Sequence, residues 1–69
     1  MQRAHEAEDA IARGDKNYAD GDYEQALNEY KTALDLLPIA PATQALRDAA
    51  SLRYCNAAVH LARQRAQGG

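Results

Sequence analysis

The chain has 69 residues, a formal net charge of −2 and one cysteine, which allow one small domain without an internal disulfide or a zinc motif. No apolar run approaches the ~20 residues of a membrane-spanning helix, so we expect no membrane insertion. Acidic residues also stand near the N-terminus, where a signal peptide would need an apolar core, so no targeting segment is expected.

The charges are unevenly distributed along the sequence. Residues 1–37 hold nine acids and four bases, whereas residues 38–69 hold one acid and four arginines. We interpret the two parts as solvated helix faces that complement each other. The basic residues are few and spread around a helix, so a nucleic-acid partner is not expected.

The first helix is predicted from about Arg3 or His5 to Ala19. Apolar or small residues recur there every three or four positions, which is the period of one helix face. This predicted buried stripe consists of Ala7, Ile11, Gly14 and Tyr18.

A tight turn and a second helix follow. Gly21 can adopt the positive φ that ends a helix, and Asp22 is a good N-cap that forms a capping-box pattern with Gln25. Pro38 disfavours helix in the residue before it, so the second helix is predicted from Tyr23 to about Leu37. Its apolar stripe contains Tyr23, Ala26, Leu27, Tyr30, Ala33, Leu34 and Leu37.

The spacing of small and aromatic residues over about residues 7–40 resembles one tetratricopeptide repeat. The positions that carry the resemblance are Gly14, Tyr18, Gly21, Asp22, Tyr23, Ala26, Tyr30, Ala33 and Pro38. That family folds about 34 residues into a helix–turn–helix unit. The chain departs from the family pattern at Ala10, Arg13 and Asn17, where a large aromatic residue, a leucine and a tyrosine are usual. Independently of the family, small side chains at Gly14, Ala26 and Ala33 would let two helices approach closely.

Two prolines, Pro38 and Pro41, interrupt the helical pattern. Thr43 is a candidate N-cap of the third helix, and Pro41 is the alternative start, in its first turn. This helix occupies the segment 41–66 and is predicted to end at about Gln64 or Ala66, before a flexible tail at 67–69. We expect the first two helices to be antiparallel and the third to pack against both. The core-facing track of the third helix is Leu46, Ala50, Tyr54, Ala57 and Leu61.

The third helix also carries a second, mostly alanine track formed by Ala45, Ala49, Leu52, Val59, Ala62 and Ala66. One track suffices to close a three-helix bundle, so the second is expected to contact something else, either a further helix of a longer protein or another copy. The residues predicted for self-association as a homodimer are Ala49, Leu52, Val59 and Ala62.

The segment 52–62 resembles the first helix of a following repeat, so the chain corresponds to about one and a half repeats. The resemblance implies that a protein or peptide partner binds on a concave face. Its positions fall on Glu8, Ile11, Asp15, Tyr18, Ala19 and Asn56. The alternative, left open by the sequence, is that Ile11 and Tyr18 belong to the core and the acids are simply solvated.

Some family members grip the C-terminal carboxylate of heat-shock chaperones with a lysine and two asparagines. Aligned on Gly14, the lysine falls on Ile11 and the first asparagine on Asp15, and only Asn56 matches. An apolar residue and an additional negative charge would disfavour a carboxylate, so chaperone-tail binding by a complete clamp is not expected.

No pattern in the sequence predicts catalysis, a cofactor or a metal. His5 and His60 lack ligand partners at metal-binding spacing, and His60 is expected at the solvent edge of its helix. Cys55 is interpreted as a small, half-buried apolar side chain. There is no glycine-rich phosphate loop, serine–histidine constellation or catalytic carboxylate pair.

The sequence therefore predicts an all-α, three-helix unit of the tetratricopeptide type with a long third helix, spanning residues 1–69 as one domain. The predicted function is a protein–protein interaction module without catalytic activity. The alternative is a structural assembly domain of a larger bacterial envelope or secretion complex of the secretin type. The cytoplasm is the default compartment, and the periplasm applies if the chain is cut from a secreted parent.

Overall fold

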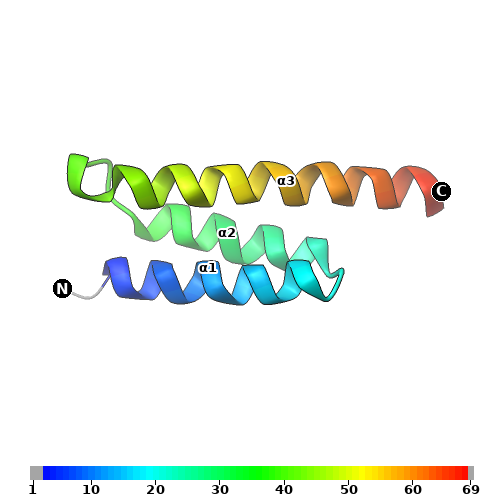
Figure 1. Cartoon of the computed structure of the whole chain (residues 1–69), viewed down its shortest axis with the longest axis horizontal. Helices are drawn as coiled ribbons and strands as arrows, with labels where there is room; N and C mark the ends of the chain where they lie inside the picture. The colour runs from blue at the N-terminus through cyan, green and yellow to red at the C-terminus, as the bar shows by residue number, and fades with distance from the viewer. Residues whose placement is uncertain (1–2, 69) are drawn as a thin grey trace.

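The structure is a computed structural model that describes residues 3–68 and consists of three α-helices, each antiparallel to the one before it (Figure 1). Helix α1 spans Arg3–Ala19, α2 spans Tyr23–Leu36 and α3 spans Gln44–Gly68. A short 3₁₀ helix, η1, spans Pro41–Thr43 immediately before α3. The described part of the chain contains no strand, which confirms the all-α prediction.

The predicted helix boundaries differ from the structure mainly at the end of α3. Helix α2 ends at Leu36, one residue before the predicted position, because Leu37 adopts the extended backbone that a following proline favours. Helix α3 continues through Gln67 to Gly68, whereas a flexible tail was predicted from residue 67. The last residue of that predicted tail, Gly69, lies outside the described residues.

The turn between α1 and α2 is a Schellman motif followed by a capped helix. Gly21 has φ 83°, its N–H donates to the carbonyl of Tyr18 (3.1 Å), and the N–H of Asp22 donates to the carbonyl of Asn17 (2.9 Å). The Asp22 carboxylate accepts the N–H of Gln25 at 3.3 Å. This is one half of the predicted capping box. The other half, a bond from the Asp22 N–H to the Gln25 side chain, does not form, because that N–H already donates to the carbonyl of Asn17.

Side chains of Thr43 and Arg47 stabilise the connection between α2 and α3 by donating hydrogen bonds to backbone carbonyls of the connection and of the end of α2. Pro41 is the first residue of η1 and not part of the first turn of α3, which begins at Gln44. Thr43 directly precedes α3, at the predicted N-cap position, but its hydroxyl donates backwards to the carbonyls of Pro38 (2.6 Å) and Ala40 (3.1 Å) instead of capping α3. Arg47 reaches back from α3 and donates to the carbonyls of Leu34 (3.2 Å) and Leu37 (2.7 Å), which satisfies the C-terminus of α2.

The core is built mainly from alanines packed around one tyrosine. Tyr30 is 1 % exposed and is the only large side chain that is fully buried among the described residues. The predicted stripes account for most of the core, and Ala10 is an addition. The buried apolar residues are Ala7, Ala10, Ile11, Ala26, Tyr30, Ala33, Leu37, Ala50 and Ala57.

The three helices form a layer rather than a closed bundle, with α2 in the middle (Figure 1). The prediction that α3 packs against both other helices is correct only in part, because α3 packs mainly on α2 and meets α1 only at a few points, such as the pairs Asp15–Arg53 and Tyr18–His60. Closing α3 onto α1 would bury the carboxylates of Glu8 and Asp15, which are exposed here. The molecule is accordingly elongated, with extents of 43 × 17 × 14 Å.

Ala26 is 0 % exposed and belongs to the alanine-rich core. Replacing it with leucine should overpack this core and lower the free energy of unfolding by ~1–3 kcal/mol. For a domain of this size, each kcal/mol shifts the melting temperature by roughly 4–8 °C, so calorimetry measures the effect directly. The matched control is Ala12→Leu at an exposed position of α1. Equal melting temperatures for the two variants would contradict the assignment of Ala26 to the core.

Candidate binding groove

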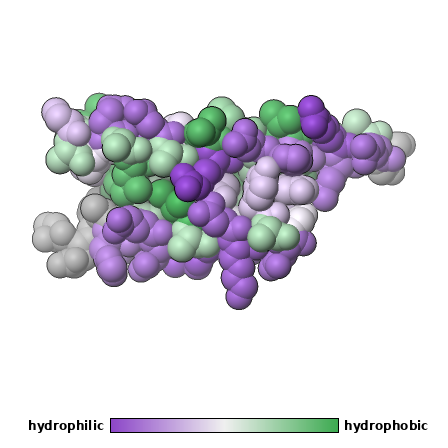
Figure 2. Space-filling model, in the orientation of Figure 1, coloured by the Kyte–Doolittle hydropathy of each residue, from purple (hydrophilic) through white to green (hydrophobic). Residues whose placement is uncertain are grey.

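A groove runs between α1 and α3 on the face shown in Figure 2. It has two hollows, which together define the groove. The first, of about 160 Å³, is lined by Asp15, Tyr18, Tyr30, Arg53 and Asn56. The second, of about 450 Å³, is lined by Glu8, Ala42, Thr43, Ala45, Leu46 and Ala49.

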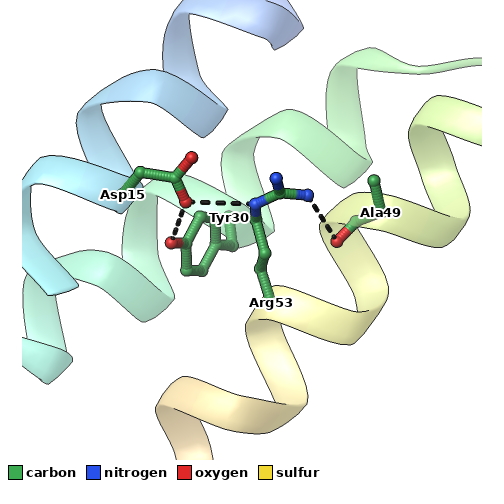
Figure 3. A network of polar contacts seen from close by, with 4 residues as sticks. All are labelled: Asp15, Tyr30, Ala49 and Arg53. Atoms are coloured by element: carbon green, nitrogen blue, oxygen red, sulfur yellow. Dashed lines mark hydrogen bonds and ion pairs between the residues drawn. The ribbon is translucent and has the colours of Figure 1, made fainter.

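One carboxylate ties the three helices together beneath the first hollow (Figure 3). The hydroxyl of Tyr30, from α2, donates to Oδ1 of Asp15, on α1, at 2.5 Å. The same oxygen accepts a hydrogen bond from Nε of Arg53, on α3, at 3.1 Å. Arg53 also donates to the carbonyl of Ala49 within α3 at 3.4 Å. The groove wall is therefore held by hydrogen bonds as well as by packing.

The hydroxyl of Tyr30 is the titratable group that this arrangement perturbs most. Burial raises its pKa above the ordinary value, and the hydrogen bond to the Asp15 carboxylate and the charge of that carboxylate raise it further. Arg53 acts in the opposite direction, but less strongly. Tyr30 thus stays neutral and acts as the donor. The ion pair between Asp15 and Arg53 is partly exposed, with 48 % and 41 % of the two side chains accessible, so on its own it adds at most ~1 kcal/mol.

The second hollow is mostly apolar. Alanines from η1 and α3 and the side chain of Leu46 form most of its lining, with the carboxylate-bearing Glu8 on the α1 side. Figure 2 shows apolar side chains gathered at this end of the groove, between α1 and the start of α3. The groove therefore offers a polar, hydrogen-bonded hollow at one end and an apolar hollow at the other.

Three rings meet beside the first hollow, near the turn that joins α1 and α2. His60 of α3 stacks on Tyr23 with ring centroids 5.0 Å apart, and it forms an edge-to-face pair with Tyr18 at a centroid distance of 5.4 Å. Tyr18 and Tyr23 form an edge-to-face pair at 5.2 Å. His60 is half-buried in this cluster rather than at the solvent edge that the sequence predicted, because both aromatic partners come from the neighbouring helices.

The structure brings four of the six predicted partner-binding residues to the groove. Asp15, Tyr18 and Asn56 line the first hollow, and Glu8 lines the second. Ile11 is 7 % exposed and belongs to the core, so the alternative interpretation is correct for this residue. Ala19 is exposed and lines neither hollow.

Two residues of the first hollow were not predicted from sequence as partner-facing. Tyr30 was assigned to the core, which is correct for its ring but does not account for its hydroxyl. Arg53 was not assigned to any contact, because its partner Asp15 lies 38 positions earlier in the chain. The only signal in the sequence was that the first helix carries acidic residues and the third carries arginines. Such complementary charges do not by themselves identify Asp15 and Arg53 as an ion pair.

The predicted self-association residues do not share one face. Leu52 and Val59 are 64 % and 50 % exposed and Ala62 is exposed, whereas Ala49 lines the second hollow. Cys55, predicted as half-buried, is also exposed, because it lies on the side of α3 turned away from α2.

Within residues 3–68, no group of three or more histidine, cysteine or acidic side chains is arranged to hold a metal ion. In the same range, no helix combines the length and the apolar character that crossing a membrane requires. Comparisons with protein-family models, with curated proteins and with solved structures found no match.

Proposed function

We propose that this protein is a protein–protein interaction module that binds a peptide segment in the groove between α1 and α3, in the manner of a tetratricopeptide repeat. The observation that carries the proposal is the convergence of Asp15, Tyr18 and Asn56 in one hollow. The resemblance to the repeat family had assigned these positions, from two different helices, to a ligand-facing surface.

The chemistry of the groove supports a peptide with two kinds of side chain. The apolar hollow beside Leu46 and Ala49 suits an aliphatic or aromatic residue of the partner. The carboxylates of Glu8 and Asp15 and the amide of Asn56 suit a donor such as a basic or amide side chain. Ile11 is buried and Asp15 already holds Arg53, so the groove presents no lysine–asparagine clamp for a terminal carboxylate.

A displayed library of random peptides tests this proposal. Peptides enriched on the native chain should bind with micromolar dissociation constants, about −8 kcal/mol, when they are measured by calorimetry. Ala49→Arg, which fills the apolar hollow, should weaken these peptides at least about tenfold. The matched control Ala66→Arg introduces the same charge at an exposed position outside both hollows and should change little. An acidic chaperone-tail peptide serves as the non-binding reference.

Two outcomes would contradict the proposal. One is that no peptide is enriched above background on the folded native chain. The other is that the enriched peptides bind Ala49→Arg and the native chain equally, because binding would then lie elsewhere on the surface. Circular dichroism of each variant confirms that a loss of binding is not a loss of the helices.

A further inference from the structure

The outer face of α3 carries a regular apolar seam. We call this set the outer seam, and its members are Leu52, Cys55, Val59, Ala62 and Ala66. They follow one another at intervals of three and four residues, which is the a/d pattern of a two-helix coiled coil. All of them are exposed, with Leu52 at 64 % and Val59 at 50 %.

The outer seam lies opposite the side of α3 that packs on α2. At about 100° per residue, the core-facing positions Ala50 and Ala57 lie on one side of the helix and the seam positions on the other. Ala50 and Ala57 are both 0 % exposed. None of the seam residues lines either hollow of the groove. Helix α3 is the edge of a three-helix layer whose outer side is uncovered (Figure 1).

The charges beside the seam indicate the direction of a partner helix. Asp48 continues the seam towards the N-terminus of α3, and Arg63 flanks it near the C-terminus. A parallel second copy of α3 would place Asp48 against Asp48 and Arg63 against Arg63. An antiparallel copy centred near Cys55 would place Asp48 beside Arg63 at both ends and Leu52 beside Val59 in the middle.

The size of the seam sets the strength of such a contact. From Asp48 to Ala66 the helix rises about 27 Å, and one helix pair of this length buries on the order of 1,000 Å² in total. This area is at the lower limit for a specific interface. The complex should therefore be weak, with a dissociation constant in the micromolar range or above.

We propose that the outer seam of α3 binds a second copy of this chain, with the two α3 helices antiparallel and centred near Cys55. The second α3 continues the alternating directions of α1, α2 and α3 and extends the layer to six helices. This contact leaves the groove of each copy open, so it is independent of peptide binding there.

Sedimentation equilibrium of the native chain tests self-association, and three variants test its geometry. Leu52→Glu combined with Val59→Glu should remain folded and become monomeric, since both side chains are largely exposed in one copy. Asp48→Arg should weaken association at least about tenfold, because it faces Arg63 of the other copy. Asp48→Arg combined with Arg63→Glu should restore association, because an antiparallel pair regains opposite charges.

Cross-linking gives an independent reading of the register. A short bismaleimide should link the native chain through Cys55, because both copies of this residue lie near the symmetry axis. Moving the single cysteine to the end of the seam, with Cys55→Ser and Ala66→Cys, should abolish the link, because the two sites would be roughly 30 Å apart in an antiparallel pair. In a parallel pair, the cross-link would instead form in both the native chain and the variant with its cysteine at position 66.

Three results would overturn the proposal. The first is a native chain that stays monomeric up to about 1 mM. The second is association that the combined Asp48→Arg and Arg63→Glu variant fails to restore. The third is efficient cross-linking at residue 66. Failure of peptide binding in the groove would not affect any of these measurements, so the two proposals can fail separately.

Discussion

Gly14→Ala should lower the free energy of unfolding by ~1–3 kcal/mol, although the same change usually stabilises a helix by ~1 kcal/mol. A Cβ atom at position 14 would lie 2.5 Å from Cε1 and 2.8 Å from Cδ1 of Tyr30. Tyr30 is 1 % exposed and its hydroxyl is fixed by Asp15, so the ring has little room to move. The overpacking term therefore exceeds the gain in helix propensity.

Urea unfolding followed by circular dichroism measures this effect. The control is a double-mutant cycle with Tyr30→Leu, which removes the ring atoms that a Cβ atom would meet. In the Tyr30→Leu background, Gly14→Ala should become neutral or stabilising, since only the helix propensity remains. A stabilising effect of Gly14→Ala in the native background would show that α1 and α2 are further apart at this point than the structure places them.

The helices and the turn could be predicted from sequence because each is encoded locally. Gly21 is a glycine where the chain needs a positive φ, and Pro38 stops α2 through its effect on the preceding residue. The apolar period likewise placed Ala7 and Ile11 on the buried stripe of the first helix and Tyr30 on that of the second, and all three are buried. These signals operate within a few residues, which is the range over which a single sequence is informative.

The groove could be predicted only in part, because it depends on how far α3 stands from α1. The period of apolar residues in α3 predicts which side of the helix is buried. It does not predict whether that side contacts one helix or two. The resemblance to the repeat family supplied the positions of Asp15 and Asn56, whereas the contact from Tyr30 and Arg53 to one carboxylate oxygen depends on three-dimensional register. Ile11 was assigned to both the core and the ligand-facing surface, and burial decides in favour of the core.

The stability of the chain should fall as the pH rises above about 10, the ordinary pKa of tyrosine, and Tyr30 should cause part of that fall. Burial and the Asp15 carboxylate raise the pKa of Tyr30 in the folded chain. The unfolded chain therefore releases this proton first. The stabilising contribution is complete below the unfolded pKa and is lost as the pH rises towards the folded pKa, by up to ~1.4 kcal/mol per pH unit.

Comparing the native chain with Tyr30→Phe isolates this contribution from other groups that titrate at alkaline pH. At neutral pH the variant should be less stable by ~1 kcal/mol, because Asp15 loses a hydrogen bond while the ring still packs on Gly14. Above about pH 10 the two stability curves should converge, because only the native chain has a hydroxyl at position 30 to ionise. Parallel curves for the native chain and Tyr30→Phe up to the alkaline transition would mean that the hydroxyl of Tyr30 is hydrated in solution, so the three-helix contact at Asp15 would not form as described.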